Sequence, residues 1–302
     1  YHADSSDFKT IYLTPSMSWK VTDKLSLGAG LSAMYIDANL SQMVDFGLIA
    51  YSLSAGALGA PQGQDGKADL NADDWAYGFN LGALYEFDQD TRIGFAYRSK
   101  VHAELEGSAD FTIPTSVTGL PAGVGTGIAA AFADTGVSGK ITLPATASLS
   151  IYSKVTDRLA LMADVTWTEW STFQQLIFDF SNPLATDSVT PEKWDDTWRY
   201  SVGASYDYNE SLVLRGGLAF DETPMKDNYR TPRIPGNDRF WVSCGAGYKF
   251  SESLAMDIAY SHLFVDDAKI NLVSAENTAK GYLTGSFENS VDIASIQLSY
   301  KF

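Results

Sequence analysis

An alternation of apolar and polar residues, repeated from one end of the chain to the other, constrains this sequence more than any other feature. In residues 293–302, Ala294, Ile296, Leu298 and Tyr300 share an apolar face, while the residues between them are mostly polar. A β-strand has a period of two residues, so this stretch predicts a strand with one apolar face and one wet face. A soluble sandwich or a membrane barrel could contain such a strand, and the rest of the chain must decide between them.

Ten further segments show the same alternation, each about ten residues long, which is the length of a tilted membrane strand. The eleven expected strands are residues 11–21, 25–36, 77–87, 92–105, 143–154, 159–170, 197–208, 211–221, 239–250, 254–265 and 293–302. Their connections alternate between tight turns and long loops, and the long ones are expected at 37–76, 106–142, 171–196, 222–238 and 266–290. Short turns at one rim and long loops at the other are typical of outer-membrane proteins. We therefore expect an all-β fold, a transmembrane up-and-down antiparallel β-barrel.

Composition supports this fold and excludes several function classes. The aromatic fraction of 13% suits the aromatic girdles of a membrane barrel, and no apolar run approaches the 18 residues of a transmembrane helix. A net charge of −16 without a basic stripe argues against nucleic acid as a partner. The single cysteine, Cys244, allows neither an internal disulfide nor a cysteine-based metal site.

Catalysis is poorly supported, because the three histidines are isolated and no serine–histidine–acid spacing is recognisable. We therefore expect no enzyme activity, no cofactor and no metal. Acidic pairs at the ends of the long loops could bind calcium, but solvated rim charge explains them better. They are Asp73–Asp74, Asp195–Asp196 and Asp266–Asp267.

The odd number of expected strands is informative. Bacterial single-chain barrels normally have an even number, with both ends on the periplasmic side. Counting back from Phe302 at that side, the first strand would begin on the outer side. We therefore expect residues 1–302 to be a single barrel domain that lacks at least one preceding strand, as the C-terminal portion of a longer protein.

Two of the long connections are unusually apolar. Residues 43–60 contain Phe46, Leu48 and Ile49, and residues 113–133 are rich in alanine, glycine and other apolar residues. Exposed loops are usually polar, so these segments should form short helices that bury against something or that bind an apolar ligand. They could pack on each other as a lid, and a ligand groove could still lie between them.

Several blocks of sequence, in order along the chain, carry a family resemblance. They include DDWAYGFNLGALYEF at 73–87, TRIGFAYRSKV at 91–101, WTEWSTFQQL at 167–176, LRGGLAFDETP at 214–224 and IPGNDRFWVS at 234–243. These blocks resemble the FadL/TodX-type long-chain fatty acid and hydrocarbon transporters of the outer membrane. The resemblance implies a fourteen-stranded barrel with an N-terminal hatch, so this chain would hold about eleven strands and lack the hatch. Phe302 would be an assembly signal, as in many outer-membrane proteins that it resembles.

The same resemblance implies passive transport of hydrophobic compounds by a monomer in the outer membrane of a Gram-negative bacterium. Apolar outer loops would capture the compound from water or lipopolysaccharide, and it would then pass inward through the barrel lumen. The partners would be this ligand, the outer-membrane lipid around the barrel and lipopolysaccharide. Long-chain fatty acids are the expected ligands, with aromatic hydrocarbons as the alternative. A general porin or a structural barrel is the other possibility, but a porin should have an inward-folded polar loop, and the apolar loops favour the transporter.

A long-chain carboxylate in the lumen needs a cation for its head group, and a low-dielectric wall strengthens that contact. By strand parity Arg98 and Lys100 face the lumen, as do Arg199 and Arg215. Similarity to the family favours Arg98, in YRSK, as the head-group contact; the alternative is that these cations pair with lumen carboxylates. Trp241 also points inward by parity and could form a wall of the passage.

Overall fold

Antiparallel β-strands make up nearly all of the chain. The computed structural model describes residues 1–121, 123–274, 277–278 and 280–301. Within them, one sheet of sixteen strands contains all the long strands, and a separate pair forms a small hairpin. In chain order the strands are β1 (Ser5–Leu13), β2 (Ser16–Lys20), β3 (Leu25–Asp45), β4 (Asp65–Glu86), β5 (Thr91–Arg98), β6 (Val101–Thr112), β7 (Thr135–Leu143), β8 (Thr146–Lys154), β9 (Leu159–Thr168), β10 (Gln175–Phe180), β11 (Ser188–Pro191), β12 (Thr197–Asp207), β13 (Leu212–Asp221), β14 (Arg239–Lys249), β15 (Leu254–Val265), β16 (Ala268–Leu272), β17 (Leu283–Phe287) and β18 (Ser290–Tyr300).

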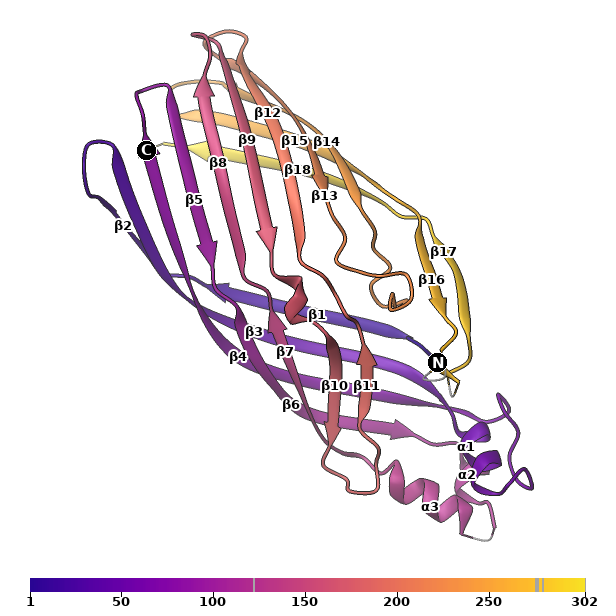
Figure 1. The fold of residues 1–302 in the computed structure, drawn as a ribbon. Coiled ribbons are helices and arrows are strands. Elements are labelled where there is room, and N and C mark those ends of the chain that lie inside the picture. The colour runs from indigo at the N-terminus through magenta and orange to yellow at the C-terminus, as the bar shows by residue number, and fades with distance from the viewer. Residues whose placement is uncertain (122, 275–276, 279, 302) are drawn as a thin grey trace.

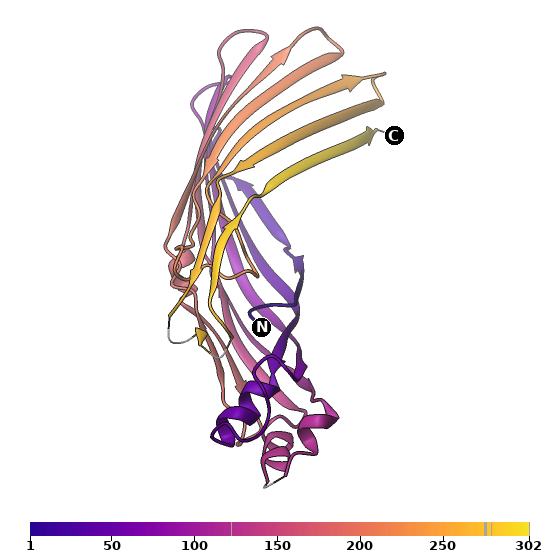
Figure 2. The same cartoon turned by 90° about the vertical axis from the view of Figure 1, so that its right-hand side faces the viewer.

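Successive long strands are also neighbours in the sheet, which curves strongly along its length (Figures 1 and 2). β1 and β2 both pair with β3, and the path continues through β4, β5–β6, β7–β8, β9, β12, β13, β14 and β15 to β18. The predicted all-β, antiparallel, up-and-down arrangement is confirmed. In the part of the chain that the structure describes, neither β18 nor β1–β2 pairs with a further strand at its outer edge. Phe302 lies outside the described residues.

The long connections contain more strand than the sequence suggested. The segments expected as loops at 37–76 and 106–142 are strand at both ends, because β3 and β6 continue past the membrane-length segments and β4 and β7 begin before them. Two further segments that were expected to be loops contain hairpins: β10–β11 within 171–196 and β16–β17 within 266–290. The predicted loop bounds were wrong because each strand was ended where its outward face stops being apolar.

That pattern reverses part-way along the strands. The short turns lie uppermost in Figure 1, and β3 begins at one of them. Near this start Leu27 and Leu31, which share the outward face of the strand by parity, are exposed. Farther along the same strand Met34 and Ile36 are buried on the inner face, and Asp37 projects outward. Lipid rewards apolar residues on the outside of a barrel, whereas water rewards them on the inside. The inner apolar cluster of this outer part consists of Met34, Ile36, Ala38, Ala76, Val101, Ala103 and Leu105.

A β-bulge separates β5 from β6 at Ser99 and Lys100. Asn80 of β4 pairs with Arg98, and an unbroken register would pair Asp73 with residue 105; the structure pairs Asp73 with Glu106 instead. One extra residue therefore lies in the β5–β6 path, and it reverses which alternate residues face the lumen.

The two apolar loops form a helical cap beyond the ends of the strands (Figure 1). Its helices are α1 (Phe46–Leu53), α2 (Thr115–Thr118) and α3 (Val124–Ala131). Asp45 caps α1 by accepting a hydrogen bond from the Leu48 backbone N–H at 2.8 Å, and its other carboxylate oxygen accepts one from the Gln62 backbone N–H. None of the described helices has the length and apolar character needed to cross a membrane.

Candidate functional site

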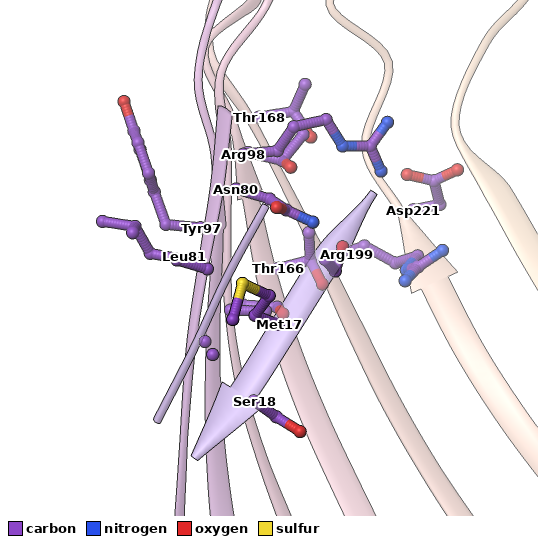
Figure 3. A pocket seen from close by; sticks show the side chains of 17 residues that line it. Met17, Ser18, Asn80, Leu81, Tyr97, Arg98, Thr166, Thr168, Arg199 and Asp221 are labelled. Carbon is purple, nitrogen blue, oxygen red and sulfur yellow. The ribbon is translucent and has the colours of Figure 1, made fainter. Parts of the chain in front are cut away.

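A cavity of about 680 Å³ lies against the inner face of the sheet and is lined by residues of β2, β3, β4, β5, β8, β9, β12 and β13 (Figure 3). Small polar residues such as Ser16, Thr146 and Thr166 line much of it. The charged residues of its lining are Arg98, Arg199 and Asp221, which point into the same space in Figure 3, while Leu81 and Tyr97 point away. Because small side chains leave the wall open, the long arginines determine its chemistry.

Arg98 is the last residue of β5, immediately before the bulge, and it pairs in register with Asn80 of β4. It interacts with the phenol of Tyr12 from β1. Among the described residues it has no carboxylate within 4.0 Å, so the predicted alternative, pairing with a lumen acid, does not hold in this structure. The orientation predicted for Arg98 is correct, and its charge is available to a ligand.

Arg199 belongs to a row of charges across three strands. It lies directly opposite Asp221 of β13, which in turn lies opposite Arg239 of β14. The Arg239 Nε–Asp221 Oδ2 distance is 3.7 Å, and the Arg199 Nη2–Asp164 Oδ1 distance is 3.9 Å. Both distances are too long for hydrogen bonds, so these charges attract one another but are only loosely paired.

Arg215 faces the lumen as predicted, but it does not line the cavity. Its Nη1 donates to Asp257 Oδ1 at 2.6 Å. The pair lies over Gly247, where an added Cβ would come within 2.6 Å of the Asp257 carboxylate and 3.2 Å of the guanidinium. Arg215 is therefore a partner in a close structural ion pair.

The lumen orientation predicted for Lys100 is wrong. Its ammonium pairs with Glu169 Oε1 at 2.6 Å, beyond the end of β9, and it is not part of the cavity lining. The bulge is the physical reason, because the parity that places Arg98 on the inner face is reversed after Ser99 and no longer applies to Lys100. His102, on the same face by parity, is likewise exposed and contacts Thr142.

Trp241 lies on the inner face of β14, two residues after Arg239, in agreement with its parity. It is outside the cavity lining, so a wall role there stays a prediction. Its indole Nε1 and the Arg239 Nε are buried and lack a hydrogen-bond partner within the described chain. Two neighbouring donors are thus left without acceptors on one strand.

Phe46 does not present a capture surface. It is fully buried and packs edge-to-face on Phe132, with ring centroids 5.0 Å apart, in a cluster that joins the two apolar loops. Leu48 and Ile49 are half-buried, whereas Tyr51 and Leu53 of the same helix are exposed. The loops therefore pack on each other as a lid, the alternative that the sequence left open.

The sequence did not identify residues 222–238 as part of the site. This segment, hereafter the strap, connects β13 to β14 (Figure 1). Arg233 reaches β1 and β3: its Nη1 donates to Ser5 O at 2.8 Å and to Ser6 Oγ at 2.7 Å, and its Nη2 donates to Ser41 O at 2.9 Å. Since β1–β3 and β13–β14 are far apart in the sheet order, the strap spans the inner space.

Further contacts fasten the strap along its length. Arg230, with 1% of its side chain exposed, donates to Asp227, Gly236 O and Lys269 O. Asn289 donates to Pro235 O at 2.7 Å. The arginines and prolines of RTPRIPG at 230–236 were the only sequence signal, and nothing in their spacing indicates distant partners.

A buried carboxyl lies in the loop beside the strap. Glu192 is 5% exposed and accepts a hydrogen bond from Trp194 Nε1 at 3.1 Å. Trp194 packs with Phe173 and with Met225 of the strap. Burial raises the pKa of Glu192 to about 7, although the Trp194 hydrogen bond and the charge of Arg233 favour the ionised form.

The described residues contain no group of three or more His, Cys, Asp or Glu side chains placed to hold a metal ion. The cavity instead combines cations, hydroxyls and a single lining carboxylate. Such an arrangement can receive an anionic or hydrogen-bonding group without reacting with it.

Comparison with known sequences gives consistent relatives. The long-chain fatty acid transport protein of Salmonella typhi is 30% identical over 295 residues, which cover 93% of this chain and 66% of that protein. Outer membrane protein P1 of Haemophilus influenzae is 34% identical over 278 residues, covering 85% of this chain and 56% of that protein. The chain thus spans about half to two-thirds of the length of the curated relatives it matches.

Two solved structures have a similar fold. A FadL homologue from Pseudomonas aeruginosa has a TM-score of 0.87 and 30% identity, with 99% of this chain and 69% of that chain covered. The toluene transporter TbuX of Ralstonia pickettii has a TM-score of 0.64 at 21% identity, covering 98% of this chain and 68% of that chain, and it supports the fold alone.

The family model described as outer membrane protein transport protein (OMPP1/FadL/TodX) matches residues 1–302. Its members are transport proteins of the outer membrane, and this agrees with the strands, the loop asymmetry and the cation-lined cavity found here. The chain belongs to the OMPP1/FadL/TodX family of outer-membrane transport proteins.

Proposed function

We propose that this chain forms the larger part of a passive outer-membrane channel for long-chain fatty acids. In this proposal residues 1–302 are one barrel domain whose eleven membrane crossings belong to a closed, monomeric barrel of fourteen strands. The two open edges of the sheet and the partial coverage of the relatives support it.

The observation that carries the choice of ligand is Arg98. It is a lumen cation without a carboxylate partner among the described residues, and it lines a cavity large enough for part of an acyl chain. A neutral aromatic hydrocarbon would gain little from this charge, whereas a carboxylate would form a charge-assisted hydrogen bond. The relatives named as long-chain fatty acid transport proteins support the same choice.

Arg98→Ala tests this proposal. The full-length protein is expressed in a strain without its own transporter, and oleate and toluene binding are measured on the purified variant. The loss of a hydrogen bond to a charged group should weaken oleate binding by about 2 kcal/mol, roughly thirtyfold, while toluene binding stays within twofold. Arg98→Lys is the matched control and should recover part of the oleate affinity. Equal loss for both ligands would refute the head-group role.

The strap supports a second candidate, a general porin. A polar segment folded across the lumen is a feature expected of a porin, and Arg233 fastens such a segment here. The two candidates differ in what crosses: a porin admits small sugars in a liposome-swelling assay, and the proposed fatty acid channel does not. Rapid swelling with sugars, together with no oleate uptake, would establish the porin.

A further inference from the structure

The charges around the lumen cavity do not balance. Its lining contains two cations, Arg98 and Arg199, and one carboxylate, Asp221. These side chains face a half-open hollow beside a protein wall, where unbalanced charge interacts more strongly than in bulk water. The net positive charge of the lining therefore favours the binding of one more negative charge in the cavity.

The pairs that do exist are loose. Arg239 Nε is 3.7 Å from Asp221 Oδ2, and it is also a buried donor without a hydrogen-bond partner in the described chain. Elsewhere on the same inner wall, Arg215 and Asp257 meet at 2.6 Å with a hydrogen bond. The difference shows that close ion pairing is available to this sheet, and that the row at the cavity does not adopt it.

Asp221 holds the central place in this row. It lies between Arg199 and Arg239 in the cross-strand register, and in Figure 3 its carboxylate faces the guanidinium groups of Arg98 and Arg199 across the cavity. A ligand carboxylate that reached the arginines would meet the like charge of Asp221 at the same time. Both carboxylates need the same guanidinium donors.

We propose that Asp221 is the residue that limits the affinity of this cavity for carboxylates and thereby permits their release. The inference rests on the proposed function, since it assigns a role within the same site. Asp221 acts as an internal competitor: it moves aside as the ligand carboxylate engages the arginines, and it returns to them as the ligand leaves. Transport requires such a balance, because a site that binds too tightly retains its ligand.

The experiment is Asp221→Asn in the full-length protein, with oleate and the uncharged oleyl alcohol as probes. Removal of one partly screened like charge should tighten oleate binding about tenfold and slow its dissociation similarly. Affinity for oleyl alcohol should change less than about twofold. Asp257→Asn combined with Arg215→Gln is the matched control: it removes a lumen carboxylate outside the cavity together with the arginine that would otherwise be left unpaired, and oleate affinity should stay the same.

Two results would overturn the assignment. If Asp221→Asn weakens oleate binding or leaves it unchanged while the wild type binds oleate, Asp221 only positions the arginines. If it tightens oleate and oleyl alcohol equally, the effect is not electrostatic competition. Failure of both the wild type and the variant to bind oleate would refute the proposed function itself, and this inference with it. Circular dichroism and heat-modified migration in gels verify that each variant is folded.

Discussion

Arg233→Ala should release the strap from the opposite side of the inner wall. The substitution removes three hydrogen bonds that a cation donates to Ser5, Ser6 and Ser41. The side chain is partly exposed, so each bond is assigned about 1 kcal/mol, the net value of an ordinary protein hydrogen bond, and the total is about 3 kcal/mol. The population of the released strap should then rise about a hundredfold.

Hydrogen exchange of the strap measures this population directly. The reporters are the backbone N–H groups of Tyr229, Arg230 and Ile234, which donate within the strap to Lys226 O and Thr231 O. Their exchange should accelerate about a hundredfold in Arg233→Ala, because local opening controls exchange.

Lys226→Ala is the matched control in the same segment. It breaks an ion pair with Asp195 at 2.9 Å between two largely exposed side chains, and such pairs contribute at most about 1 kcal/mol. Exchange should therefore change by less than about fivefold. Equal exchange in wild type and Arg233→Ala would refute the reasoning, since contacts other than those of Arg233 would then hold the strap.

Two further predictions concern the outer loops. The raised pKa of Glu192, about 7 against a usual 4.5, means that its contribution to stability is fully present below pH 4.5 and is lost as the pH rises through about 7. Glu192→Gln should therefore be about 3 kcal/mol more stable than wild type above pH 7 and nearly equal to it near pH 4.5. Thermal melts of both proteins at pH 4.5 and 8 measure this difference. Parallel pH profiles of the two melting temperatures would contradict the prediction. Phe46→Ala should destabilise the helical cap by about 3 to 5 kcal/mol, because it opens a void against Phe132. Residues 46–64 and 113–134 should then be cleaved faster by proteases. Unchanged proteolysis would show that the cap does not depend on this contact.

Strand parity predicted much of the lumen correctly. Arg98, Arg199, Arg215 and Trp241 all lie on the inner face, because a period of two is preserved over each uninterrupted strand. The predicted orientation of Lys100 was wrong because a bulge inserts one residue without changing the local pattern of residue types. The sequence around it still alternates, and only the pairing partners reveal the shift.

The role of each cation could not be predicted from the sequence. Parity treats Arg98 and Arg215 alike, yet the first has no carboxylate neighbour among the described residues and the second is tightly paired to Asp257. That difference depends on residues 42 positions apart in the chain, brought together over Gly247 by the antiparallel register of β13, β14 and β15. The strap was missed for the same reason, since the partners of Arg233 lie more than 190 residues away.

The reversal of polarity along β3 has a consequence for how one continuous strand is stabilised. Near Leu27 and Leu31 the strand depends on lipid outside it, while near Met34 and Ile36 it depends on apolar neighbours inside it and on water outside. Urea weakens the burial of apolar surface from water but leaves a surrounding bilayer in place. The outer part should therefore unfold as a separate, earlier step, like a small soluble protein attached to a membrane protein. The division between the two would fall within β3, between Leu31 and Met34, rather than at any loop.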